Sequence, residues 1–313
     1  MARYLPEAGR ARLAERYDVE EDGAEVSREE LLKRVPGAAA LVADPTVAVD
    51  AAVLDAAGLQ LRVVANFAVG YDNIDVEACH ARGVVVTNTP DVLTNATAEL
   101  TVALMLAAAR RLGEGERLVR AGRWAGWEPN QLLGRELSGA VVGIVGLGRI
   151  GTRVAELLRG FEVELLYAAH SRHPEAERSL EAEHSPLEDL LERSDFVTLH
   201  VPLSPQTHHL IDAQALQRMK PGAILVNTSR GGLVDAAALA RALREERLGG
   251  AGLDVYEEEP QVPPELMELE RVVLAPHVGS ATAAARDGMA QLVAENVIAV
   301  LEARAPLTPV DPG

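Results

Sequence analysis

Short apolar runs alternate with longer amphipathic segments along most of this chain. The apolar runs are rich in Val, Ile and Leu and are bounded by Gly, Pro or Asn, which is typical of strands buried on both faces. We therefore predict strands at Ala38–Val42, Arg62–Val64, Val84–Thr87, Val141–Val145, Val163–Tyr167, Phe196–His200, Ala223–Asn227, Gly250–Val255 and Val272–Leu274.

The segments between these strands repeat their apolar residues at helical spacing. Strands that alternate with helices in this way form parallel sheets with helices on both faces. The pattern therefore predicts an α/β fold. The predicted helices are Ala48–Ala57, Ile150–Arg159, Pro186–Arg193, Ala213–Arg218 and Ala236–Glu245.

Two segments depart from the alternation. Thr97–Arg120 is rich in Ala, Leu and Arg and is predicted to form one long helix, which could bridge domains or pack against a partner subunit. Ala281–Ala303 is predicted to be a closing helix beyond the last strand.

Composition narrows the class of protein. The 313 residues suggest about two domains, and 48% hydrophobic residues with only 3% aromatic ones imply a core of Ala, Val and Leu. The 30 Lys and Arg residues against 47 Asp and Glu residues give a net charge of −17. Nucleic-acid binders need a basic surface, so we expect no nucleic-acid partner and no anionic membrane.

The single cysteine, Cys79, excludes a disulfide framework and a thiolate zinc site, and we expect no metal site. Such sparse cysteine usage fits a reducing compartment. No apolar run approaches the roughly 18 residues that cross a bilayer. The first residues also lack the apolar segment of a signal peptide. We therefore expect a cytoplasmic protein.

A glycine-rich turn follows the predicted strand Val141–Val145 and precedes a predicted helix. It reads Gly146-Leu147-Gly148-Arg149-Ile150-Gly151, a G-x-G-x-x-G pattern in the strand-to-helix context that dinucleotide binding requires. The first glycine permits the tight turn, the second lets the backbone approach a pyrophosphate, and the third lets the helix pack closely. The helix N-terminus would face the anion.

The end of the next predicted strand indicates which dinucleotide is bound. A site for NAD places a carboxylate about 20 residues after the glycines, where it binds the ribose 2′-OH. This chain has no carboxylate there and instead continues Ala168-Ala169-His170-Ser171-Arg172. Arg172 and its neighbours could bind a 2′-phosphate. We predict that Ala169–Arg172 favour NADP(H), with NAD(H) possible.

Three further motifs each follow a predicted strand: Asn227–Gly232, Gly252–Pro260 and Pro276–Ser280. Ligands of open α/β sheets bind at the carboxyl ends of the strands. Hydride transfer to a carbonyl needs a residue that orients the substrate and one that donates a proton. Arg230 in the first motif and His277 in the third could supply these two functions.

Taken together, these motifs resemble the D-isomer-specific 2-hydroxyacid dehydrogenase family. The resemblance covers nearly the whole chain, and within the family it is strongest to glyoxylate/hydroxypyruvate reductases. It implies NAD(P)H-dependent reduction of a small 2-keto acid to the D-2-hydroxy acid. The matching segments are Ala65–Asp75, Asn88–Leu93, Gly146–Gly151, Asn227–Gly232, Gly252–Pro260 and Pro276–Ser280.

The resemblance also implies a role for each site residue. Arg230 would bind the carboxylate and keto oxygen of the substrate, and His277 would donate the proton. Glu259 would hydrogen-bond the imidazole of His277 and stabilise its cation; it is chosen over Glu257 and Glu258 because the family's catalytic glutamate immediately precedes the proline. The peptide N–H groups of Val69 and Gly70 would hold the substrate carboxylate. The cofactor would contact Gly146, Leu147, Gly148, Arg149, Ile150, Gly151, Ala169, His170, Ser171, Arg172, Thr228, Ser229, Asp254 at the nicotinamide end, and Gly279.

The family architecture consists of two Rossmann-like or flavodoxin-like domains with parallel sheets and an active site in the cleft between them. By this resemblance, residues 1–98 form the substrate domain, completed by a C-terminal helix within 282–313, and residues 99–281 form the dinucleotide-binding domain. Closure of the domains would exclude water during hydride transfer. The long helix and Trp124–Leu133 would contribute to a homodimer.

The chain departs from the family pattern in two places. Members usually begin with a short apolar strand ahead of the segment that matches Arg3–Glu7. We expect either that this strand is missing, which would leave the sheet of the substrate domain one strand short, or that the start site is misassigned. Many glyoxylate/hydroxypyruvate reductases carry Trp-x-Pro-x-Trp, whereas here Gln131 stands in place of the second Trp. The substrate preference would differ if that ring shapes the pocket.

Two alternatives stay open. The chain could be a dehydrogenase for another 2-hydroxy acid, of the D-lactate or phosphoglycerate type. The same fold also serves as a nucleotide-sensing corepressor, which could keep the glycine turn without turnover. The presence of Arg230, Glu259 and His277 together favours the enzyme.

Overall fold

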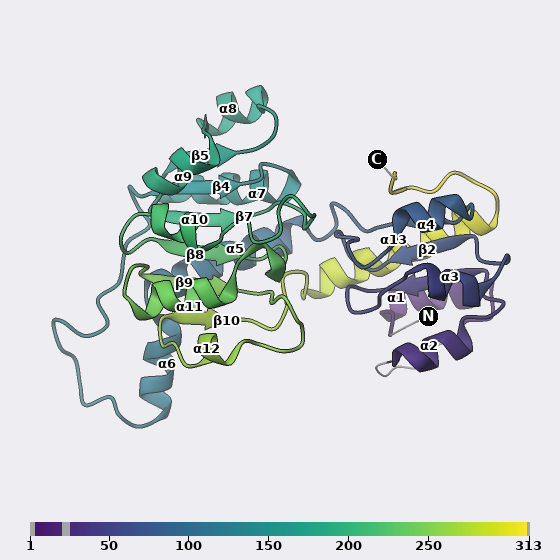
Figure 1. Cartoon of the computed structure of the whole chain (residues 1–313), viewed down its shortest axis with the longest axis horizontal. Helices are drawn as coiled ribbons and strands as arrows, with labels where there is room; N and C mark the ends of the chain where they lie inside the picture. The colour runs from purple at the N-terminus through teal and green to yellow at the C-terminus, as the bar shows by residue number, and fades with distance from the viewer. Residues whose placement is uncertain (1–3, 21–25, 312–313) are drawn as a thin grey trace. The chain divides into compact units, whose positions relative to one another are not determined.

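The computed structural model describes residues 4–20 and 26–311 of the chain. The chain divides into two compact units, Met1–Leu93 with Ser280–Gly313, and Thr94–Gly279. The first unit therefore takes its residues from both ends of the sequence, and the second is continuous (Figure 1).

A three-stranded parallel sheet in the order β1-β2-β3 forms the centre of the first unit. Hydrophobic residues of α2, α3 and α4 pack with those of the strands into one core. Side chains of Ser27, Asp50 and Asp75 accept hydrogen bonds from the first turns of these three helices and so fix where they begin. The elements are α1 (Glu7–Ala14), α2 (Arg28–Arg34), β1 (Ala40–Ala43), α3 (Ala51–Ala57), β2 (Val63–Asn66), α4 (Val76–Ala81), β3 (Val85–Thr87) and α13 (Ala283–Leu301).

Helix α13 also packs on β2, and α1 packs on α13. The two helices approach so closely that a Cβ on Gly9 would lie 2.2 Å from the carbonyl oxygen of Ala290. At the C-terminal end of α13, the guanidinium of Arg62 donates hydrogen bonds to the carbonyls of Val300 (2.7 Å) and Leu301 (2.8 Å). These contacts fasten the C-terminal helix to the N-terminal part of the chain.

A seven-stranded parallel sheet in the order β10-β9-β8-β7-β4-β5-β6 forms the centre of the second unit. Its elements are α5 (Thr94–Ala109), α6 (Leu112–Arg120), β4 (Val141–Val145), α7 (Arg149–Leu158), η1 (Arg159–Phe161), β5 (Glu164–Ala168), α8 (Pro174–Leu180), β6 (Glu183–His184), α9 (Leu187–Arg193), β7 (Phe196–Leu199), α10 (Ala213–Arg218), β8 (Ile224–Asn227), η2 (Gly231–Leu233), α11 (Ala236–Arg244), β9 (Gly250–Leu253), α12 (Pro264–Met267) and β10 (Val272–Leu274).

The strand order reverses at β4. From there β5 and β6 extend to one side, and β7 to β10 extend to the other (Figure 1). A reversal of this kind leaves a crevice at the carboxyl ends of the central strands, where open α/β sheets bind their ligands. The Gly146–Gly151 turn leaves β4 at this point.

Helices cover both faces of the large sheet, and each face has its own core. Val142 and Ile144 of β4 pack with α5 and α7 on one face. Val145 and the alternate residues of β7 and β8 pack with α9, α10 and α11 on the other. Because both faces are covered, the strands carry the unbroken apolar runs seen in the sequence. The prediction of an α/β fold with parallel sheets is confirmed.

The prediction of one long helix over Thr97–Arg120 is wrong. Helix α5 ends at Ala109, Arg111 adopts a left-handed conformation (φ 51°), and α6 begins at Leu112. The carbonyl of Ala109 accepts its hydrogen bond from the N–H of Arg135 (2.9 Å) instead of from the next helical turn. Gly134 allows this approach, since a Cβ there would lie 2.3 Å from the same oxygen. A contact between distant residues therefore ends the helix.

Several short elements did not stand out in the hydrophobic pattern, namely α1, α2, α4, α8, β6 and α12. Each offers too few apolar positions to set a periodicity. The expectation of a missing opening strand concerns the chain ahead of Tyr4, outside the described residues. In the part of the chain that the structure describes, no helix has the length and apolar character needed to cross a membrane.

Candidate active site

The glycine-rich turn has a different constraint at each glycine. Gly146 has φ 95°, and a Cβ there would lie 2.7 Å from the carbonyl oxygen of His200 at the end of β7. A Cβ on Gly151 would lie 2.1 Å from the carbonyl oxygen of Gly146, so only glycine lets α7 start this close to β4. At Gly148, by contrast, a Cβ would meet no described atom within 4 Å. The turn therefore leaves open space at the N-terminus of α7.

The residues predicted to bind a 2′-phosphate follow β5 directly. His170, Ser171 and Arg172 are exposed. The guanidinium of Arg172 pairs with Glu177 of α8 through Nε–Oε1 and Nη2–Oε2 distances of 3.0 and 2.5 Å. The hydroxyl of Tyr167 also donates to Glu177 Oε1 (2.6 Å). Hydrogen bonds from Arg172 and Tyr167 lower the pKa of Glu177 to about 2, so Arg172 faces a permanent negative charge.

Asn227, the first residue of the motif after β8, holds the motif in a turn through its side chain. The Asn227 side chain donates to the carbonyl of Arg230 (2.8 Å) and accepts from the N–H of Ser229 (3.0 Å). The hydroxyl of Ser229 donates to the carbonyl of Val201 (2.6 Å), which ties the turn to the loop after β7. Thr228 shares a 2.8 Å hydrogen bond with Thr101 of α5. These contacts fix the backbone from which the half-buried Arg230 projects.

Asp254, at the end of β9, is fully buried and holds the segment that carries His277. Its carboxylate oxygens accept hydrogen bonds from the backbone N–H groups of Val278 (2.8 Å) and Gly279 (2.7 Å). Its own carbonyl accepts the N–H of His277 (2.8 Å), which has a left-handed backbone conformation (φ 52°). Burial raises the pKa of Asp254, although these two backbone hydrogen bonds oppose the shift.

His277 and Glu259 form a hydrogen-bonded pair. The Nδ1–Oε2 distance is 2.6 Å, and the side chains are 33% and 27% exposed. Burial alone would raise the pKa of Glu259, but hydrogen bonds from His277 and from the N–H of Tyr256 (3.0 Å) outweigh it, and the charge of Arg230 adds to them. The pKa of Glu259 is therefore lowered, and the carboxylate is ionised at neutral pH.

The three consecutive glutamates have different surroundings. Glu259 pairs with His277, whereas the Glu257 carboxylate hydrogen-bonds His208 and His209 instead. Glu258 is exposed. Of the three, only Glu259 has the contact with His277 that the sequence analysis expected.

The segment that contains Val69 and Gly70 follows β2 in the other unit. The Asn88 side chain donates to the carbonyl of Val69 (2.8 Å), and the Asn66 side chain donates to the carbonyl of Gly70 (2.7 Å). The C=O and N–H of a trans peptide point in opposite directions. The hydrogen bond from Asn88 to the Val69 carbonyl therefore fixes the direction of the Gly70 N–H group.

Within the second unit, the structure brings Arg230, Asp254, Glu259 and His277 to one end of the sheet, beyond the strands that carry them. Three residues with structural roles were not predicted from the sequence, namely Thr101, Tyr256 and Glu177. Thr101 hydrogen-bonds Thr228 and the N–H of Tyr256 donates to Glu259, whereas Glu177 pairs with Arg172 after β5. Thr101 lies within a helix and Tyr256 within a motif, so neither gave a signal of its own. Glu177 lies five residues after Arg172, a spacing that could have indicated the pair.

Chemically, the group combines a guanidinium, which matches a carboxylate or a carbonyl oxygen, with an imidazole whose Nδ1 is engaged by an ionised carboxylate. Such an imidazole can give and take a proton at Nε2. Together with the open glycine turn, the arrangement suits redox chemistry at a carbonyl with a dinucleotide.

Comparison with known families supports this interpretation. Residues 102–279 match the family model described as D-isomer specific 2-hydroxyacid dehydrogenase, NAD binding domain. Over 317 aligned residues the chain is 51% identical to the glyoxylate reductase of Thermococcus onnurineus, covering 99% of this chain and 95% of that protein.

Two solved structures resemble this chain over almost its full length. A glyoxylate reductase from Paecilomyes thermophila has a TM-score of 0.89 and 32% identity, covering 98% of this chain and 95% of that one. An NADPH-dependent glyoxylate/hydroxypyruvate reductase from Sinorhizobium meliloti, solved with NADP and malonate, has a TM-score of 0.87 and 35% identity, covering 98% and 94%.

Proposed function

Because this chain belongs to the D-isomer-specific 2-hydroxyacid dehydrogenase family, we propose that it reduces glyoxylate and hydroxypyruvate with NADPH. The enzyme is an oxidoreductase with a nicotinamide cofactor. The observation that carries the proposal is the 2.6 Å hydrogen bond between His277 and Glu259, close to the guanidinium of Arg230.

The turn after β4 fits a dinucleotide, because the space around Gly148 is open at the N-terminus of the ten-residue helix α7. Gly146–Gly151 would hold its pyrophosphate, and NADPH, when bound, supplies the hydride. Thr228, Ser229, Asp254 and Gly279 would lie toward its nicotinamide end, as the family resemblance implies.

His277 is the proposed proton donor. Its Nδ1 is held by the ionised Glu259, so Nδ1 keeps its hydrogen and Nε2, on the opposite edge of the ring, is the atom that exchanges a proton. The nearby carboxylate stabilises the imidazolium that precedes proton donation. Glu259 therefore acts as a positioning residue, and Asp254 fixes the backbone on which His277 stands.

Arg230 is the proposed binder of the substrate's carboxylate and keto oxygen. Its planar guanidinium can donate two parallel hydrogen bonds, which a lysine cannot do. The N–H groups of Val69 and Gly70 are proposed to bind the same carboxylate. The hydrogen bonds that Asn88 and Asn66 make to the carbonyls of this segment support that role.

NADPH is the proposed cofactor in preference to NADH. The support is the absence of a carboxylate between Ala168 and Arg172 and the position of Arg172 directly after β5. A bound 2′-phosphate would compete with Glu177 for the Arg172 guanidinium. The Glu177→Gln variant should therefore lower KM for NADPH and leave KM for NADH unchanged, with exposed Glu175→Gln as the matched control.

The cofactor proposal has a direct test in the ratio of kcat/KM for NADPH and NADH. Charge-assisted hydrogen bonds of about 1.5–3 kcal/mol correspond to a preference of roughly 10- to 150-fold. Arg172→Asp should shift that ratio toward NADH by a similar factor. A wild-type preference for NADH would refute the assignment of Ala169–Arg172.

The activity itself is tested by the decrease in NADPH absorbance with glyoxylate and with hydroxypyruvate. Pyruvate and phosphohydroxypyruvate serve as comparison substrates for the D-lactate and phosphoglycerate alternatives. Higher kcat/KM with either comparison substrate would overturn the substrate assignment. NADPH binding without turnover of any 2-keto acid would favour the corepressor alternative.

We also propose a homodimer in the cytoplasm. Large hydrophobic side chains are exposed on α6 and the segment after it, among them Val119 (59%), Trp127 (82%) and Leu133 (65%). Figure 1 shows α6 and this segment extending away from the large sheet. Gln131, at the position of the expected second Trp, accepts a hydrogen bond from the Trp124 indole (3.2 Å). Light scattering of the purified protein tests the dimer; a monomeric mass would refute it.

A further inference from the structure

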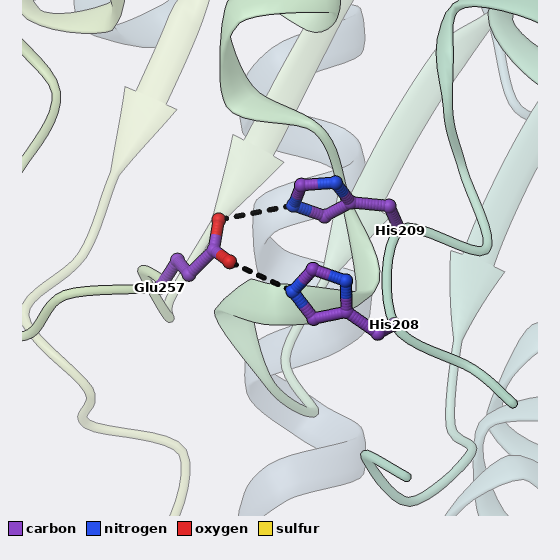
Figure 2. A group of neighbouring side chains, drawn as sticks. All are labelled: His208, His209 and Glu257. Atoms are coloured by element: carbon purple, nitrogen blue, oxygen red, sulfur yellow. Dashed lines mark hydrogen bonds and ion pairs between the residues drawn. The ribbon is translucent and has the colours of Figure 1, made fainter. Parts of the chain in front are cut away.

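Two histidines and a glutamate outside the proposed catalytic group converge at the surface of the second unit. His208 and His209 lie in the loop between β7 and α10, and Glu257 lies in the segment after β9 (Figure 2). The Nε2 atoms of the two imidazoles are 2.9 and 3.1 Å from the two carboxylate oxygens of Glu257. One potential ligand atom from each residue lies within 4.8 Å of the other two.

The backbone brings the two rings to the same side. His209 adopts a left-handed conformation (φ 49°), which is uncommon for a residue other than glycine. Its N–H donates to the carbonyl of Gly232 (2.8 Å), and the N–H of His208 donates to the carbonyl of Ser204 (2.9 Å). As a result the imidazoles stack, with ring centroids 4.0 Å apart and an interplanar angle of 25° (Figure 2).

The residue types of this group match those of known zinc sites. One carboxylate lies beside two imidazoles, and each side chain offers one ligand atom to a shared position. Two histidines and one glutamate are the protein ligands of several zinc enzymes.

We propose that His208, His209 and Glu257 form a binding site for Zn²⁺, with water as the remaining ligand. Zinc takes imidazole nitrogen and carboxylate oxygen at about 2.0–2.2 Å in tetrahedral geometry. The side chains of His208, His209 and Glu257 are 50%, 35% and 39% exposed. Small rotations can therefore exchange the hydrogen bonds between them for bonds to a shared ion. The site is distinct from the His277–Glu259 pair and stands independently of the proposed function.

A bound ion would join three segments of the second unit. His209 is hydrogen-bonded to Gly232 in η2, and a Cβ on Gly231 would lie only 1.9 Å from the carbonyl carbon of Tyr256, next to Glu257. Zinc would therefore fasten the loop after β7 to the segments that carry Arg230 and Glu259. Since an ion that binds only the folded state stabilises it, zinc should raise Tm.

The test is calorimetric titration of tag-free, chelator-treated full-length protein with ZnCl₂, together with thermal unfolding with and without the ion. We expect one Zn²⁺ per chain and a higher Tm. His208→Gln, His209→Gln and Glu257→Gln should each weaken binding at least about tenfold, since even outer-shell partners contribute roughly 10- to 100-fold. Exposed His80→Gln should leave binding unchanged.

Co²⁺ supplies an independent readout, because the intensity of its visible absorption distinguishes tetrahedral coordination by protein ligands from the hexaaquo ion. A tetrahedral spectrum that is lost in Glu257→Gln would support the site. Unfolding of each variant without metal shows whether it is still folded. The proposal is overturned if the folded wild type binds no Zn²⁺ at micromolar concentration, or if the three variants bind it as the wild type does.

Discussion

Replacement of Glu259 by Gln is the sharpest test of the proposed acid. Gln keeps the size of the side chain and can still accept a hydrogen bond, but it removes the negative charge 2.6 Å from His277 Nδ1. A hydrogen bond to a charged group contributes about 1.5–3 kcal/mol. If that stabilisation of the imidazolium is fully expressed in the transition state, kcat should fall roughly 10- to 150-fold.

The assay is steady-state NADPH oxidation with glyoxylate from pH 5 to 9. In Glu259→Gln the alkaline limb of the kcat profile should move to lower pH, because the imidazolium has lost its anionic partner. A merely structural role would lower the rate equally at every pH. The matched control is Glu258→Gln, which removes a charge from the exposed neighbouring residue. An unchanged profile in Glu259→Gln, or the same loss in the control, would refute the reasoning.

Four other outcomes are expected. His277→Ala should reduce kcat at least about a hundredfold while NADPH binding, followed by fluorescence titration, is retained. Arg230→Lys should raise KM for glyoxylate and lower kcat, since the planar fork is lost. Gly151→Ala should destabilise the fold by about 1–3 kcal/mol in urea unfolding because its Cβ would clash with Gly146, whereas Gly160→Ala, in open space, should not. The lowered pKa of Glu259 means that its stabilising contribution is complete above pH 4.5 and is lost as pH falls through the folded-state value, so the stabilities of wild type and Glu259→Gln should converge in acid.

The parts of the fold that local chemistry determines were predictable from the sequence. The bounds of β4 and β10 follow from their apolar runs, because both faces of the sheet are covered and these two strands carry apolar residues or glycine throughout. The glycine turn was predictable because Gly146 needs a positive φ and Gly151 a close approach.

The parts that distant contacts determine were not predictable. Helix α5 ends where Arg135, 26 residues further along, takes the carbonyl of Ala109. His208 and His209 gave no metal signal, because adjacent histidines lack the spacing of known metal motifs and their third partner, Glu257, lies 48 residues beyond His209. In the second case the partners are brought close by the order of the strands, because β7 and β9 both lie next to β8.

The fastening of α13 to α1 and β2 has a consequence for the synthesis of the chain. The first unit lacks its last helix until roughly 200 further residues have been made, a delay of about 10–40 s at typical translation rates. During that interval the continuous second unit can leave the ribosome and fold, while the apolar surface that α13 later covers stays uncovered. The N-terminal third of the nascent chain is thus the part that most needs protection from aggregation.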